Sequence, residues 1–125
     1  MASRRQRKLA ELLHEEISGI LHLNTQDPRL GMVTVTGVEV TADLLTAQVY
    51  VTVLGDESDA KEAMTGLSKA GGYIRYQLGK ALSLRRVPDL TFKLDHSLEY
   101  ALHIENLLNE VKDDLNPSPS DLESD

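Results

Sequence analysis

The chain of 125 residues contains no cysteine and no tryptophan, and its aromatic residues are four tyrosines and one phenylalanine. The lack of cysteine excludes disulfides, thiolate nucleophiles and cysteine-ligated metal sites. The few aromatic rings leave little surface on which single-stranded bases could stack. No apolar run approaches the roughly 18 residues that a membrane span needs, and the charged N-terminus lacks the apolar core of a secretory signal. We therefore expect a soluble, cytoplasmic protein.

The formal net charge is −7, but the charges are unevenly distributed. Residues 110–125 hold six acids and one lysine. Two other segments are basic. The first eight residues contain four cations, and residues 69–93 contain six cations and one acid: Arg4, Arg5, Arg7 and Lys8 in the first, and Lys69, Arg75, Lys80, Arg85, Arg86 and Lys93 in the second. Because a partner meets the local field rather than the net charge, both basic segments are candidates for contact with an anion.

Hydrophobic periodicity predicts the order α-β-β-α-α-β-α. The predicted elements are a helix over 3–23, strands over 32–40 and 45–54 joined by 41–44, helices over about 56–70 and 72–82, a strand over 90–95 and a helix from Ser97. A hairpin that is followed by a helical crossover predicts an α+β fold. Its small mixed sheet has helices on one face, and right-handed crossover makes the third strand parallel to a neighbour.

Smaller features refine this outline. The valines of the first strand change parity after Val35, which predicts a bulge near Thr36-Gly37. Ser3 is expected to cap the first helix, and Asp56 or Ser58 to cap the helix after the hairpin. We expect one domain over 1–112. The Pro-, Ser- and acid-rich residues 113–125 are expected to form a disordered tail.

Two adjacent glycines, Gly71 and Gly72, interrupt the helical pattern of the second basic segment. A glycine pair costs a helix roughly 2 kcal/mol relative to alanine. The pair can be a simple kink or corner. Alternatively, the backbone approaches a ligand closely there, and a helix that starts at Gly72 offers its amides and its positive dipole end to a phosphate. Lys69, Arg75 and Lys80 would surround such a site.

KH domains clamp nucleic acid with a Gly-x-x-Gly loop between two helices, and no such motif occurs in this chain. Its corner reads Ala70-Gly71-Gly72 instead. Three stretches make the chain resemble the family of ribosome-binding factor A: the basic first helix with RRQRKLAELLHEEI, residues 27–55 and residues 69–99. The resemblance covers nearly all of 3–112 and implies a type II KH-like fold in which an Ala-x-Gly kink replaces the loop. The acidic tail has no characteristic counterpart in the family.

The resemblance implies a non-enzymatic assembly factor that binds the immature 30S subunit and 16S rRNA near the decoding region. It further implies a role in late 30S maturation and 16S rRNA processing, above all in the cold, and release by an assembly GTPase. We expect a monomer without cofactor or metal. Residues and resemblance together give the candidate RNA contacts: Arg4, Arg5, Arg7, Lys8, Lys69, Ala70, Gly71, Gly72, Arg75, Lys80, Arg85 and Arg86.

Other interpretations stay open at this point. The basic N-terminus could be merely solubilising, and the pair Arg85-Arg86 could be a solvated loop. Arg29 could pair with Asp27. Tyr73 and Tyr76 could stack on bases, although half-buried packing with hydroxyls in water is the simpler expectation.

Rival functions also remain. One is a general KH-type module for single-stranded RNA, and the other is a protein–protein adaptor that uses the exposed sheet face or the tail. An enzyme is disfavoured, because residues 14–18 (HEEIS) have serine where a zinc-protease helix needs its second histidine. The adjacent residues 95–97 (DHS) cannot align as a catalytic triad by adjacency alone.

Overall fold

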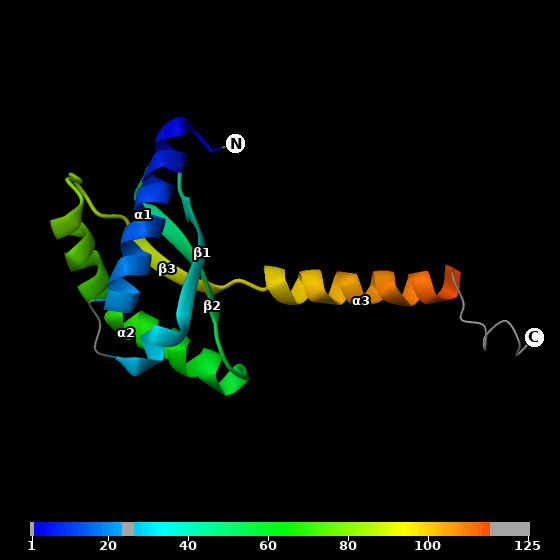
Figure 1. Cartoon of the computed structure of the whole chain (residues 1–125). Coiled ribbons are helices and arrows are strands. Elements are labelled where there is room, and N and C mark those ends of the chain that lie inside the picture. Colours follow the sequence, from blue (N-terminus) through cyan, green and yellow to red (C-terminus); the bar gives the residue numbers. More distant parts are fainter. Residues whose placement is uncertain (1, 24–26, 116–125) are drawn as a thin grey trace, which may run out of the picture. The chain divides into compact units, whose positions relative to one another are not determined.

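The computed structural model describes residues 2–23 and 27–115, except for the side chains of 98–100 and 112–115 (Figure 1). The elements in chain order are α1 (Arg4–Leu23), a 3₁₀ helix η1 (Pro28–Met32), β1 (Val33–Val40), β2 (Thr46–Val53), α2 (Glu57–Ala81), β3 (Asp89–Leu94) and α3 (Ser97–Leu115). They form two compact units, Met1–Asp95 and His96–Asp125. None of the helices in the described ranges has the length and apolarity that crossing a membrane requires.

The sheet is mixed, in the order β1-β2-β3, with β1 antiparallel and β3 parallel to β2. This confirms the predicted α+β class and the predicted parallel third strand. The register shifts between Val35 and Gly37, which confirms the bulge. Because of the bulge, Val40 returns to the buried side that Val33 and Val35 already occupy.

The hairpin connection is one residue longer than predicted and spans 41–45. The backbone N–H of Thr41 donates to the carbonyl of Thr46 at 2.9 Å, and the hydroxyl of Thr41 accepts from the N–H of Thr46 at 3.1 Å. Leu44 adopts a left-handed φ of 62°. The alternation of polar and apolar residues does not report side-chain hydrogen bonds or a left-handed leucine. The predicted start of the second strand is therefore wrong by one residue.

Helices α1 and α2 pack against the same face of the sheet and enclose the core (Figure 1). The fully buried side chains come from α1, the sheet and α2: Leu13, Ile17, Leu21, Val33, Val49, Val51, Leu67, Ile74 and Leu78. No polar or charged side chain is buried among the described residues. Apolar burial of this kind supplies the main driving force for folding, and it leaves the charged side chains of the unit at its surface.

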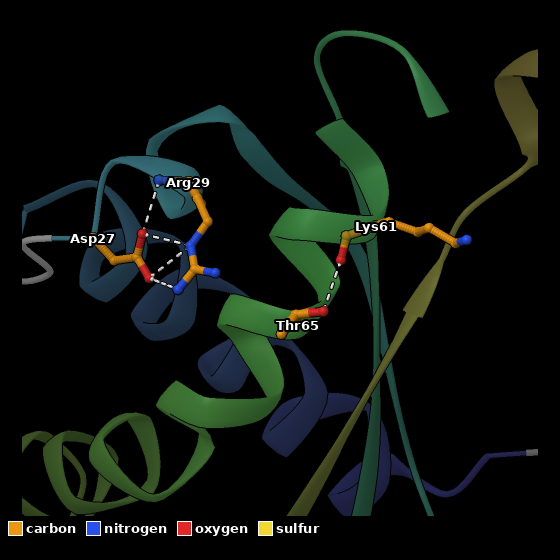
Figure 2. Close-up of polar contacts among 4 residues, drawn as sticks. All are labelled: Asp27, Arg29, Lys61 and Thr65. Carbon is orange, nitrogen blue, oxygen red and sulfur yellow. Dashed lines mark hydrogen bonds and ion pairs between the residues drawn. The ribbon is translucent and has the colours of Figure 1, made fainter. Parts of the chain in front are cut away.

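Helix α2 corrects the prediction of two separate helices. It is one assigned helix over Glu57–Ala81 whose axis changes direction part-way along, as Figures 1 and 2 show. Glycine pairs are a known cause of such bends. Because the helix is continuous, the amides of Gly72 and the residues after it belong to the helical hydrogen-bond ladder. The predicted phosphate site at a free helix start is therefore wrong.

The true N-terminus of α2 lies at Asp56, one of the two predicted caps. Asp56 accepts from the N–H of Asp59 at 2.9 Å, and Asp59 accepts from the N–H of Asp56 at 3.0 Å. This reciprocal pair forms a capping box. The acidic groups at this end complement the helix dipole and leave no site for an added anion.

Candidate nucleic-acid interface

The first two turns of α1 carry Arg4, Arg5, Arg7 and Lys8, and all four side chains are exposed. The helix is capped as predicted, because Ser3 accepts from the N–H of Gln6 at 3.1 Å and donates its own N–H to the Gln6 side chain at 2.8 Å. Cations at a helix N-terminus oppose the helix dipole, and this first turn holds no acid. Within the described residues none of the four cations forms an ion pair.

The loop between α2 and β3 presents Arg85 and Arg86, both exposed. Pro88 is fully buried at the end of this loop. From α2, the Arg75 guanidinium donates to the carbonyls of Val87 at 3.0 Å and Pro88 at 3.2 Å. The burial of Pro88 and the two hydrogen bonds from Arg75 hold the loop backbone in place next to Arg85 and Arg86, whose side chains are exposed.

Arg75 itself was predicted to contact phosphate, but its donors are directed at its own chain. Besides the two carbonyls, its guanidinium lies 3.3 Å from the carboxylate of Asp89. The side chain is 41% exposed, so this ion pair by itself adds little stability. Within the chain, Arg75 positions the loop that carries the two exposed arginines, and its direct contact with phosphate stays a prediction.

The basic turn of α1 and the loop of Arg85 and Arg86 lie at the same end of the sheet. The side-chain amide of Gln6 donates to the carbonyl of Val40, where β1 ends, at 2.9 Å. The hairpin turn 41–45 follows there, and its last carbonyl accepts from the N–H of Asp89 at 2.9 Å. Arg86 lies close enough to this turn to help lower the pKa of Asp43.

We call this surface the basic end; its members are Arg4, Arg5, Arg7, Lys8, Arg85 and Arg86. They are brought together from two segments about 80 residues apart in the sequence. Six exposed cations on one end of a small domain form a local positive field on a chain whose net charge is negative. Such a surface suits a polyanion, and a nucleic-acid backbone above all.

Lys69 lies elsewhere, on the side of α2 that faces η1. There the Arg29 guanidinium binds the Asp27 carboxylate through two nitrogens, at 3.0 and 2.7 Å (Figure 2), which confirms the pairing that the sequence left open. Lys69 adds to the positive field at Asp27. Figure 2 also shows Lys61 pointing away from this pair on α2. Because η1 precedes β1, Lys69 is separated from the basic end by about the length of a strand.

The second half of α2 exposes two tyrosines that were expected to be half-buried. Tyr76 is 63% exposed, which corrects that expectation, and Tyr73 is 43% exposed. The ammonium of Lys80 lies 5.4 Å from the ring centroid of Tyr76, within cation–π range. The spacing of 69, 72, 73, 76 and 80 is that of one helix face, and this signal could have predicted their exposure. The exposed ring can stack on a base, and the lysine beside it can neutralise a phosphate.

The glycine pair is not required by packing inside the described structure. A Cβ added to Gly71 or Gly72 would meet no atom within 4 Å, and neither residue has a positive φ. We predict that Gly71→Ala and Gly72→Ala each raise the free energy of unfolding by up to about 1 kcal/mol, because alanine favours helix. If a partner approaches this backbone closely, the same variants weaken binding to the small ribosomal subunit that the family resemblance implies.

Gly19→Ala is the matched control, since this glycine lies in α1 and its Cβ would also meet open space. It should stabilise the protein and leave binding unchanged. Denaturant titration and co-sedimentation provide the two measurements. Unchanged binding by both Gly71→Ala and Gly72→Ala would assign the pair to the bend of the helix alone.

Three carboxylates, the half-buried Asp27 and the exposed Asp43 and Asp56, have a pKa below the ordinary 3.8 of aspartate. The causes are hydrogen bonds: from the Arg29 side chain for Asp27, from the Thr41 hydroxyl for Asp43, and from the backbone N–H of Asp59 for Asp56. A pKa that is lower in the folded state contributes stability at pH values above 3.8, and this contribution is lost as the pH falls through the lowered pKa.

We therefore predict that the free energy of unfolding is steady from pH 7 to about 5 and falls below about 4. Urea titrations across this range measure the change. The variant Asp27→Asn should show a smaller acid-induced loss than the wild type. An identical pH dependence in the variant would contradict the role assigned to the pair of Asp27 and Arg29.

Other sites offer less chemistry. A hollow of about 310 Å³ between α2 and β3 is lined mainly by Met64, Leu67, Leu90 and Phe92, and no titratable residue lines it. The ring nitrogen Nε2 of His14 lies 3.1 Å from the carbonyl of Val35, so this histidine is engaged by the backbone. Among the described residues no three His, Asp or Glu side chains gather as a metal site would require.

The model of the family ribosome-binding factor A matches residues 5–108. The chain belongs to this family. A ribosome-binding factor A from Trichlorobacter lovleyi is 50% identical over 111 residues, which cover 89% of this chain and 90% of that protein. One from Desulfitobacterium hafniense is 47% identical over 112 residues, which cover 90% of each chain. The resemblance inferred from the three sequence stretches is thus confirmed.

Solved structures of ribosome-binding factor A share the fold. The crystal structure from Thermus thermophilus has a TM-score of 0.63 at 27% identity and covers 71% of this chain and 94% of its own. The solution structure of a putative member from Thermotoga maritima has a TM-score of 0.64 at 30% identity and covers 74% and 89%. A Thermus thermophilus homology model at 28% identity, with a TM-score of 0.56, was fitted into a cryo-EM map of a 30S complex; it covers 77% and 97%.

Proposed function

We propose that this chain is a non-catalytic assembly factor that binds the immature 30S subunit through its basic end. The ligand is the phosphate backbone of 16S rRNA, and the factor assists late maturation of the subunit and processing of its rRNA, most strongly in the cold. An assembly GTPase would release it in the cytoplasm. The finer parts of this proposal, namely processing, cold dependence and release, derive from membership of the family.

The observation that carries the proposal is the convergence of six exposed cations at one end of the sheet. Each cation can neutralise a phosphate and release condensed counterions, which supplies affinity without reading a sequence. The Thermus thermophilus relative was fitted to a 30S complex, so a small-subunit ligand is in keeping with this surface. Tyr73 and Tyr76 add a place for unpaired bases beside Lys80.

The rival of a general single-stranded RNA module is weakened by α2, which is continuous where KH domains have a clamping loop. The adaptor rival has two forms, and the form that uses the sheet face rather than the tail would require that face to be apolar. In the unit Met1–Asp95 the outer face instead carries polar contacts, such as the hydrogen bond from the Tyr50 hydroxyl to Gln48 at 2.8 Å. Thr36 on the same face donates to Asp95 at 2.5 Å.

The proposal is tested by removing the gene from its host and measuring 16S rRNA ends by primer extension. We expect precursor 16S rRNA and free subunits to accumulate, more at low than at optimal growth temperature. The wild-type gene should restore mature ends, and the variant Arg85→Glu/Arg86→Glu should not. Normal 16S ends at both temperatures in the deletion strain would refute the maturation role.

A further inference from the structure

Helix α3 carries a stripe of apolar side chains that are open to solvent. Every side chain described in this helix, over residues 101–111, is exposed. Residues at i, i+3, i+6, i+7 and i+10 share one face of the helix, and these are Ala101, Ile104, Leu107, Leu108 and Val111. The four large ones are between 36% and 58% exposed. A contiguous apolar face of this kind marks an interaction site.

The stripe is bordered by acids. Helical geometry places Glu105 on one flank and Glu110 on the other, at about 100° and 120° from Ile104. Over Ser97–Leu115 the sequence has five acids and one lysine. Residues 101–111 include no lysine or arginine. The face of α3 is thus both apolar and negatively charged, the opposite of the basic end.

The charges beside the stripe determine which class of partner can bind there. RNA would be repelled, because no cation on this part of the helix could neutralise a phosphate. A second copy of α3 would bring the same acidic flanks against each other, and like charges at a helix contact are destabilising. A segment that is apolar along one face and rich in lysine or arginine beside it would match both the stripe and its borders.

We propose that the stripe of α3 docks a basic, amphipathic segment of a partner protein. The apolar side chains of the partner cover Ile104, Leu107, Leu108 and Val111, and its cations pair with Glu105 and Glu110. This would give the chain two separate surfaces, one for a polyanion and one for a basic protein. The docking surface is independent of the proposed role in 16S processing, since it uses another helix and another class of partner.

The helix provides its own matched control. Leu102 lies two residues before Ile104, which places it on the opposite side of the helix. It is 51% exposed, and Leu108 is 58% exposed. The variants Leu108→Gln and Leu102→Gln therefore make the same chemical change at similar exposure, and glutamine keeps the helix propensity of leucine. They differ in position, because Leu108→Gln alters the stripe and Leu102→Gln does not.

The probe is a fluorescein-labelled amphipathic peptide of leucine and lysine, titrated with the full-length chain and followed by anisotropy. We expect the wild type to bind it and Leu108→Gln to weaken binding by about tenfold, the effect of losing one central apolar contact. Leu102→Gln should stay within about twofold of the wild type. A peptide of leucine and glutamate should not bind, because it repeats the charge of α3.

Four results in the binding and assembly assays would overturn the proposal. They are equal losses for both variants, binding of the acidic peptide, a dimer in sedimentation velocity that Leu108→Gln abolishes, and RNA binding that Leu108→Gln alone reduces. Thermal unfolding of the variants completes the test. If Leu108→Gln lowers the melting temperature and Leu102→Gln does not, the stripe is covered within the chain itself and the proposed partner is rejected.

Discussion

The double variant Arg85→Glu/Arg86→Glu is expected to bind small subunits about a hundredfold more weakly than the wild type at 0.1 M salt. Two charge-assisted contacts of about 1.5 kcal/mol each account for this loss. The log–log salt slope should also become shallower by about 1.5, because two phosphates are no longer neutralised. Both side chains are exposed and form no ion pair within the described residues, so folding should be unaffected.

Lys61→Glu/Lys93→Glu is the matched control for this variant, since it changes the net charge equally. Lys61 lies near the start of α2, which follows the other end of β2, and both lysines are exposed. This control should bind within about threefold of the wild type, the difference coming from long-range charge alone. Equal weakening by both variants would mean that net charge decides binding, whichever residues carry the charge.

Replacing Arg4, Arg5, Arg7 and Lys8 by glutamine is expected to produce the largest loss of affinity, above a hundredfold, with a salt slope shallower by about 3. Stability should change in the opposite direction. Glutamine preserves helix propensity, and removing cations from the N-terminus of α1 relieves their repulsion by the helix dipole. We expect the free energy of unfolding to rise by about 0.5–1 kcal/mol.

A variant that keeps the positive charges but replaces the guanidinium groups distinguishes an effect of charge from an effect of guanidinium geometry. The triple change Arg4→Lys/Arg5→Lys/Arg7→Lys should bind within a few-fold of the wild type, because phosphate neutralisation depends chiefly on charge. Denaturant titration and co-sedimentation provide both measurements. If the glutamine variant loses stability along with affinity, these cations serve α1 itself and do not belong to an interface.

Much of the fold was predictable, because alternation and helical spacing report burial directly. The break in parity between Val35 and Val38 gave the bulge, and the crossover rule gave the direction of β3. The family followed from three sequence stretches. What the periodicity could not decide is whether Gly71 and Gly72 divide α2 or merely bend it, since a glycine pair is compatible with both.

The candidate site was predictable in composition but not in arrangement. The cations of α1 and of the loop 82–88 could be named, yet their convergence depends on contacts such as Gln6 with Val40, which no local pattern encodes. The charge of Arg75 is visible in the sequence and predicts a phosphate contact, whereas its partners, two carbonyls of the loop and the carboxylate of Asp89 in β3, are not. Tyrosine occurs both half-buried and exposed, so its residue type does not predict the exposure of Tyr76, whereas its spacing of four residues from Lys80 does.

Above all, we propose that this chain binds the small ribosomal subunit through phosphate contacts at its basic end. Co-sedimentation of the purified chain with small subunits, large subunits and assembled ribosomes across a salt series tests it directly. We expect selective pelleting with small subunits, stronger for immature particles, and a log–log salt slope of about −4 to −5 if all six cations contact phosphate. Equal pelleting with all particles, or binding that salt does not weaken, would contradict the claim.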